Sequence, residues 1–147
     1  PERLPLVISE LVSAVELRLE SQVQSVLRYA RELAKTAHMS APQGDCDSRA
    51  CEVASAMVSK LPELRKMLAL DVQAAYDGDP AAEHTDEAVF CYPGIEAIFT
   101  HRIAHELYEL GVPLLPRIMQ ELAHSRTGID VHPGAAVGVW RKFVCEK

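Results

Sequence analysis

Apolar residues recur about every 3.6 positions along the first quarter of the chain, which is the period of an α-helix. The pattern predicts one long amphipathic helix, or two joined with little break. Its apolar face consists of Leu4, Ile8, Leu11, Val15, Leu19, Val23, Val26, Ala30, Leu33 and Ala37. A stripe of this length is more than a lone helix can hide from water, so we expect it to pack against other helices of this chain or of a partner.

Two polar stretches rich in turn-forming residues interrupt the helical pattern, Ser40–Ser48 and Asp77–Glu87. We expect both to be loops. The helical pattern that resumes between them has a plausible N-cap at Asp47 or Ser48. Pro62 either kinks this helix or begins a new one, because proline lacks the backbone N–H that a helix interior requires.

Two shorter helical patterns follow the second loop. The first runs from Ile95 to Leu110 and meets a natural stop at Gly111, and the second lies between Pro113 and Gly128. A tight turn separates them, so we expect the two helices to pair antiparallel.

The stretch after Gly128 differs in kind. Ile129, Val131 and Val137 are β-branched, and small residues and turn-formers lie between them, which is typical of a narrow coil or strand. Val131 and Val137 are six positions apart, but a hexapeptide solenoid needs several such repeats, because one rung cannot bury its apolar face alone.

Composition supports a mainly α fold and narrows the partners. The 147 residues suffice for one domain with a core, and 48% are hydrophobic while only 5% are aromatic, as in helix packing. The net charge of -6 disfavours binding to a phosphate backbone, so we expect no nucleic acid partner. No long apolar run is present, so we expect no membrane span and a soluble, cytoplasmic protein.

The four cysteines are candidates for metal or redox chemistry. Cys46, Cys51, Cys91 and Cys145 match no zinc spacing and no Cys/His catalytic motif, so we expect reduced thiols.

His101 and His105 lie four positions apart on a helix and could share a metal ion. The zincin order places Glu directly after the first His, and Arg102 stands there. We therefore expect no metal site, with His105 packed or capped and His101 exposed.

Three stretches together resemble the bacterial-type serine acetyltransferases. They are "DVQAAYDGDPAA" (Asp71–Ala82), "CYPGIEAIFTHRIAHELYELGVPLLPR" (Cys91–Arg117) and "TGIDVHPGAAVG" (Thr127–Gly138). The resemblance covers residues 64–138. It implies an enzyme that moves an acetyl group from acetyl-CoA, as co-substrate, to the hydroxyl of L-serine in cysteine biosynthesis.

The resemblance also implies an architecture. Residues 1–126 would form a helical N-terminal domain, residues 127–138 would begin a left-handed parallel β-helix of hexapeptide rungs, and residues 139–147 would be an atypical tail. Members of the family associate through their β-helices and their helical domains, so a homo-oligomer is expected. Many members are inhibited by cysteine.

The residues carried over from the family are Asp79 and Pro80. Asp79 matches the aspartate that helps to hold serine, and an anionic side chain on a loop is a direct partner for the ammonium group of serine. Gly78 departs from the family, which commonly has Arg there. Without the family, Asp79 before Pro80 would be interpreted as a turn opener. Asp71 and Gln73 are expected to brace or cap the helix pair, with substrate contact as the alternative.

The catalytic pair of the family is not found in the sequence. The family uses an Asp-His pair as general base, whereas "VWRKFVCEK" stands in its place and no "DH" occurs in the chain. His132 could form a dyad with Asp130, but we expect a structural role. We therefore predict no catalytic residue and no turnover for these residues, and no complex with O-acetylserine sulfhydrylase. The alternative function is a non-catalytic helical oligomerisation module.

Overall fold

The computed structural model describes residues 3–37 and 44–138, and these ranges hold five α-helices. The helices are α1 (Arg3–Thr36), α2 (Cys46–Gly78), α3 (Thr85–Cys91), α4 (Pro93–Glu109) and α5 (Leu115–Thr127). The mainly α fold is confirmed, and no strand occurs within the two described ranges. None of the described helices is both long and apolar enough to cross a membrane.

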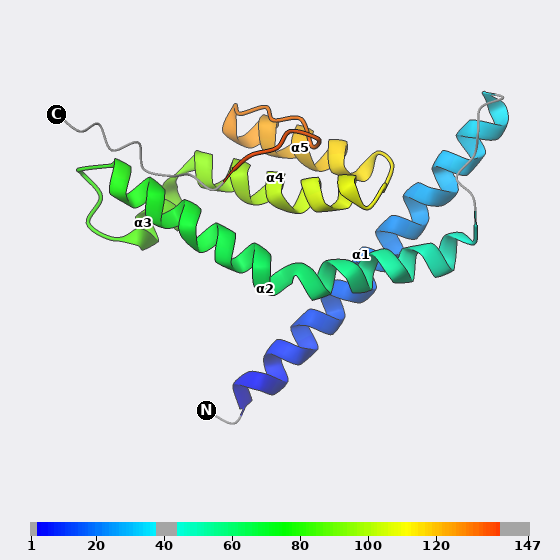
Figure 1. Cartoon of the computed structure of the whole chain (residues 1–147), viewed down its shortest axis with the longest axis horizontal. Helices are drawn as coiled ribbons and strands as arrows, with labels where there is room; N and C mark the ends of the chain where they lie inside the picture. Colours follow the sequence, from blue (N-terminus) through cyan, green and yellow to red (C-terminus); the bar gives the residue numbers. More distant parts are fainter. Residues whose placement is uncertain (1–2, 38–43, 139–147) are drawn as a thin grey trace.

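The apolar stripe of α1 divides into a buried half and an exposed half. Val23 and Leu27 are buried, whereas Leu4 and Leu11 are 63% and 61% exposed. In Figure 1 the two long helices α1 and α2 cross, and the first turns of α1 extend beyond the other helices. The single long helix predicted from the apolar period is therefore confirmed, but only its second half uses the stripe within this chain.

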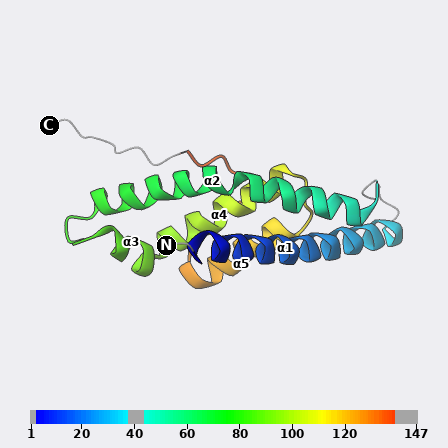
Figure 2. The same cartoon turned by 90° about the horizontal axis from the view of Figure 1, so that it is seen from below.

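The core lies where α1 and α2 cross and where α4 packs on α2. Its buried members are Val23, Leu27, Cys46, Ala50, Val53, Met57, Leu64, Leu107 and Val112. All are aliphatic or sulfur-containing, as the low aromatic content predicts. The turned view in Figure 2 shows that α1 and α2 lie in two different layers where they cross.

The N-cap of α2 lies earlier in the sequence than expected, and the helix continues through Pro62. The N-cap is Asp45, whose Oδ2 accepts hydrogen bonds from Ser48 N at 2.8 Å and Ser48 Oγ at 2.9 Å. These bonds lower the pKa of the Asp45 carboxyl. The expectation of a cap at Asp47 or Ser48 was wrong, because Ser48 is the donor to the cap. Pro62 lies inside one continuous helix, which bends along its length (Figure 1).

The short helix α3 occupies part of the stretch that was expected to be a loop. Glu87 Oε1 accepts hydrogen bonds from the backbone N–H groups of Glu83 at 3.0 Å and His84 at 3.3 Å. The Glu87 side chain thus satisfies backbone donors at the start of α3. The loop expected at Asp77–Glu87 is therefore shorter and runs from Asp79 to His84, because its first two residues belong to α2 and its last three to α3.

α4 and α5 form the antiparallel pair that the sequence predicts, and they lie side by side in Figure 1. Gly111 follows the end of α4 with φ 73°, and Gly128 caps α5 with φ 73°. This left-handed conformation is open to glycine without the steric cost that a Cβ brings. The helix ends predicted at these two glycines are confirmed.

Residues 129–138 form a coil that runs back along α4 and α5, drawn in orange to red in Figure 1. The coil expected here is present, but a strand is not. A strand needs a neighbouring strand to pair with, and the described residues supply none. The atypical tail proposed at residues 139–147 lies outside the described residues.

Three of the four cysteines fall in the described ranges, and each is a free thiol as expected. Cys46 is buried in the core, whereas Cys51 and Cys91 are exposed. Cys145 lies outside the described residues.

Candidate functional site

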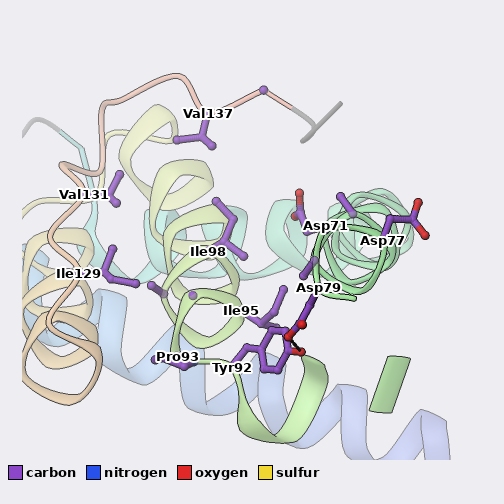
Figure 3. A pocket seen from close by; sticks show the side chains of 16 residues that line it. Asp71, Asp77, Asp79, Tyr92, Pro93, Ile95, Ile98, Ile129, Val131 and Val137 are labelled. Atoms are coloured by element: carbon purple, nitrogen blue, oxygen red, sulfur yellow. Dashed lines mark hydrogen bonds between the residues drawn. The ribbon is translucent and has the colours of Figure 1, made fainter. Parts of the chain in front are cut away.

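A pocket of about 820 Å³ opens between the end of α2, the start of α4 and the coil at residues 129–138 (Figure 3). It is lined by Asp71, Ala74, Ala75, Asp77, Gly78, Asp79, Tyr92, Pro93, Gly94, Ile95, Ala97, Ile98, Ile129, Val131, Val137 and Gly138. Figure 3 shows the carboxylates of α2 on one side and branched aliphatic side chains on the other. These lining residues include no cationic side chain, so the pocket combines an apolar wall with an acidic rim.

Asp79 lies on the acidic rim of the pocket as the C-cap of α2. Its Oδ1 accepts a hydrogen bond from Ala81 N at 2.9 Å, and the Tyr92 hydroxyl donates to its Oδ2. The bond from Tyr92, and then the bond from Ala81, lower the pKa of the Asp79 carboxyl. The carboxylate is therefore ionised at neutral pH and keeps lone pairs for a further donor, since an ionised carboxylate offers about four acceptor sites.

Pro80 and Asp77, which lie close to Asp79 in the sequence, differ in their relation to the pocket. Pro80 is exposed and is absent from the pocket lining, so its part is to hold the turn in which Ala82 N bonds Asp79 O at 3.2 Å. Asp77 lines the pocket and accepts a hydrogen bond from Gln73 Nε2 at 2.9 Å. Asp79 thus opens the turn and also lies at the pocket, while its binding of serine stays a prediction.

Asp71 braces the helices, as expected, by pairing with Arg102 of α4. Arg102 Nε lies 2.5 Å from Asp71 Oδ2, and Arg102 Nη2 lies 2.7 Å from Asp71 Oδ1. Both residues are buried. This bidentate pair satisfies the Asp71 carboxylate from behind the pocket wall, so its charge is already neutralised.

His101 and His105 hold the coil by its backbone. His101 Nε2 donates to Ala135 O at 3.1 Å, and Gln120 Nε2 lies 2.8 Å from His101 Nδ1. His105 Nδ1 donates to Pro133 O at 2.7 Å. Burial, followed by the neighbouring His105, lowers the pKa of His101. The expectation that His101 is exposed was wrong: its exposure is 1%, because it is buried between α4, α5 and the coil.

His132 belongs to the turn of the coil. Its Nδ1 accepts a hydrogen bond from Gly134 N at 3.0 Å, and its ring meets the edge of Tyr108 at a centroid distance of 5.9 Å. Within the described residues no hydrogen bond joins His132 to Asp130. The geometry agrees with the structural role expected for His132.

One cluster of potential metal ligands occurs at the start of α3. Ligand atoms of Glu83, His84 and Glu87 lie within 4.8 Å of one another. The Glu87 carboxylate already accepts two backbone hydrogen bonds there, so the cluster is explained by helix capping.

The sequence pattern did not indicate two residues that shape the pocket, Tyr92 and Arg102. Tyr92 orients the Asp79 carboxylate, and Arg102 pairs with Asp71. A weak signal was available for Arg102, because a long polar side chain occurs between His101 and the apolar Ile103 in a helix expected to be half buried.

The fold and the pocket define a helical domain that presents an ionised carboxylate beside an apolar wall. Such a site suits a small ligand that carries an ammonium group.

In sequence and in fold the chain is similar to serine acetyltransferases. A plasmid-encoded serine acetyltransferase of Synechococcus elongatus is 58% identical over 89 residues, which is 60% of this chain and 28% of that protein. Serine acetyltransferase 1 of Entamoeba histolytica in complex with L-cysteine gives a TM-score of 0.60 at 36% identity, covering 79% of this chain and 40% of that one. No family model matches the chain.

A third match is a serine acetyltransferase of Neisseria gonorrhoeae in complex with serine. Its TM-score is 0.50 at 26% identity, with 88% of this chain and 51% of that chain covered. The resemblance to serine acetyltransferases is thereby confirmed in sequence and in fold. The chain spans between 28% and 51% of the length of these three relatives.

Proposed function

We propose that this chain is the helical, serine-binding part of an enzyme that transfers an acetyl group from acetyl-CoA to L-serine. In that reaction the serine hydroxyl oxygen attacks the thioester carbonyl, the bond to sulfur breaks, and a base takes the hydroxyl proton. The products are O-acetyl-L-serine and coenzyme A. The single observation that carries the proposal is the ionised Asp79 carboxylate at the rim of the pocket.

The part proposed for Asp79 is to accept N–H bonds from the serine ammonium. Its Oδ1 and Oδ2 each receive one hydrogen bond from the protein, from Ala81 and Tyr92, which fix the direction of the remaining lone pairs. A hydrogen bond to a charged group contributes about 1.5–3 kcal/mol. The relatives that hold serine and L-cysteine support this assignment, because both amino acids present the same ammonium group.

The proposal is tested by titrating L-serine into the chain in a calorimeter, with Asp79→Asn as the variant and Asp77→Asn as the matched control. Asparagine can still accept the hydrogen bond from Ala81, so the turn persists while the charge is removed. We expect Asp79→Asn to weaken serine binding on the order of 10-fold or more, and Asp77→Asn to weaken it far less. Equal loss in both variants would mean that the rim acts only through its total charge.

Catalysis by the 147 residues alone is a separate measurement. We expect no release of coenzyme A thiol above background from acetyl-CoA and L-serine, because the sequence lacks the Asp-His pair that the family uses. Turnover on the order of 1 to 1000 per second would contradict this expectation.

The remaining parts of the proposal concern organisation. Residues 1–126 are proposed as the helical domain and residues 127–138 as the beginning of a hexapeptide-repeat β-helix, and α5 ends at Thr127, beside this boundary. A cytoplasmic location is proposed, and the free thiols of Cys46, Cys51 and Cys91 suit a reducing compartment.

A second candidate function is helical assembly. The first half of α1 exposes an apolar stripe at helical spacing, with Leu4, Ile8, Leu11 and Val15 between 51% and 63% exposed. This stripe continues the one that is buried against α2. A second copy of the chain would cover it, and the two functions are compatible in one protein.

A further inference from the structure

Arg102 is bonded to both walls of the pocket without lining the pocket itself. Its guanidinium pairs with Asp71 on the α2 wall. On the coil wall, Nη1 donates to Val137 O and Nη2 donates to Gly138 O, both at 3.3 Å. Asp71, Val137 and Gly138 are all lining residues, so one buried side chain joins three of them from behind.

The chemistry of the group suits this placement. A guanidinium is planar, always charged, and offers five donors in a fixed fork, so its bonds to a carboxylate set the direction of its remaining donors. Arg102 is 6% exposed and Asp71 is 3% exposed, so neither is free to reorient into water. Lysine in this place would keep the charge but could not reproduce the fork.

The coil wall depends on such side chains because it has no strand to pair with among the described residues. Its carbonyls are held instead by donors of α4: Pro133 O by His105, Ala135 O by His101, and the last two by Arg102. His105 attaches the coil to α4, and His101 attaches it to α4 and, through Gln120, to α5. Among the described side chains with hydrogen bonds to the coil, only Arg102 is also bonded to α2.

We propose that Arg102 is a positioning residue that fixes the width of the pocket by holding the coil wall at a set distance from the α2 wall. The inference rests on the proposed function only for the identity of the ligand, L-serine. Arg102 acts through Asp71, Val137 and Gly138. Its loss lets the coil wall move relative to the acidic rim, and a ligand that must meet Asp79 while contacting the aliphatic wall then binds more weakly.

The test compares Arg102→Lys with the matched control Arg117→Lys, which alters an exposed arginine that pairs with Glu121 on α5. Two readouts are taken on the full chain: the affinity for L-serine by calorimetry, and the methyl resonances of valines by NMR. We expect Arg102→Lys to weaken serine binding on the order of 10-fold or more. The methyl signals of Val131 and Val137 should shift, and those of the core residues Val23 and Val53 should stay in place.

A second variant separates positioning from a general loss of structure. Arg102→Ala leaves a space that free guanidinium ion, added at millimolar concentration, can enter. We expect guanidinium to return the Val137 methyl signal and the serine affinity toward their original values in this variant. The same addition should leave Arg117→Ala unchanged.

Two results overturn the inference. Arg102→Lys could leave both the Val137 signal and the serine affinity at the values of the unaltered chain, so that Arg102 has no positioning role. Alternatively, the signals of Val23 and Val53 could shift as much as that of Val137, so that Arg102 serves only overall stability. If the unaltered chain binds no L-serine, the proposed function fails, while the methyl signals still decide the role of Arg102.

Discussion

The hydroxyl of Tyr92 donates a hydrogen bond to the carboxylate of Asp79, joining the residue that precedes α4 to the residue that ends α2. The bond raises the pKa of Tyr92 to about 12, with lesser contributions from burial and from the charge of Asp79. The same bond lowers the pKa of the Asp79 carboxyl. The Tyr92 hydroxyl thus keeps its proton, and Asp79 keeps its negative charge, over the whole physiological range.

Replacement of Tyr92 by phenylalanine should raise the pKa of Asp79 toward its ordinary value, because the largest cause of the lowering is removed. The carboxyl pKa can be followed by NMR titration of the side-chain carbon. Stability linked to this group is present above the ordinary pKa and is lost as pH falls through the lowered one. In Tyr92→Phe this pH-dependent part of the stability should therefore shrink, because the folded and unfolded pKa values of Asp79 come closer together. The loss of serine binding, which needs the ionised carboxylate, should begin at a higher pH.

The control is Tyr29→Phe, which removes a hydroxyl from an exposed residue of α1. It should leave the Asp79 titration unchanged. The reciprocal experiment is an absorbance titration of Asp79→Asn, in which the pKa of Tyr92 should fall below about 12. An unchanged Tyr92 pKa would contradict the proposed coupling.

The buried His101 predicts a pH dependence of stability near neutrality. Its pKa is lowered by burial, and the charged groups that face it add to this effect: His105, whose ring stacks on it at 5.7 Å, and Arg102 beside it. The unfolded chain binds a proton at this residue below a pH of about 6.5, whereas the folded chain binds it only at a lower pH. The free energy of unfolding should therefore fall as pH falls below about 6.5, by up to about 1.4 kcal/mol per pH unit.

Urea unfolding at a series of pH values measures this slope. His101→Gln removes the titrating group and should flatten the curve below about pH 6.5, whatever its effect on absolute stability. His124→Gln is the matched control, because His124 is an exposed histidine of α5. A slope that is the same in all three proteins would show that His101 titrates normally.

Gly128 lies at the turn from α5 into the coil, and its replacement by alanine should destabilise the fold. It has φ 73°, where a Cβ costs about 1–2 kcal/mol. Gly94, near the start of α4, has no positive φ, and a Cβ there would meet no atom within 4 Å. We expect Gly128→Ala to lower the free energy of unfolding by about 1 kcal/mol and Gly94→Ala to leave it equal or higher. Thermal unfolding of the two variants gives the comparison.

The helices were predictable because their signals are local. The apolar period gave α1, and the glycines at 111 and 128 marked the ends of α4 and α5. α3 was missed, since its seven residues are too few for a period and begin among polar residues. The N-cap at Asp45 was missed because several residues in a row had the chemistry of a cap, and only the backbone conformation selects one.

The site was predictable only in part, because its contacts join residues that are far apart in the sequence. Asp79 was found through a family resemblance and lies at the pocket, while its role in serine binding stays a prediction. The bonds from Arg102, His101 and His105 to the coil join residues about 30 positions apart. Backbone carbonyls occur at every residue, so no sequence pattern indicates which of them a polar side chain will reach.

The exposed stripe of α1 gives the last prediction, on self-association. A carboxylate at the centre of an apolar contact between two copies would be buried without a partner, which costs several kcal/mol. Leu11→Glu, in the middle of the stripe, should therefore shift the chain toward monomer in sedimentation at micromolar concentration. Ser13→Glu adds the same charge at an exposed polar position of α1 and should leave the assembly intact. If the unaltered chain sediments as a clean monomer, the proposed helical assembly is excluded. If Leu11→Glu and Ser13→Glu have equal effects on sedimentation, the contact lies elsewhere on the molecule.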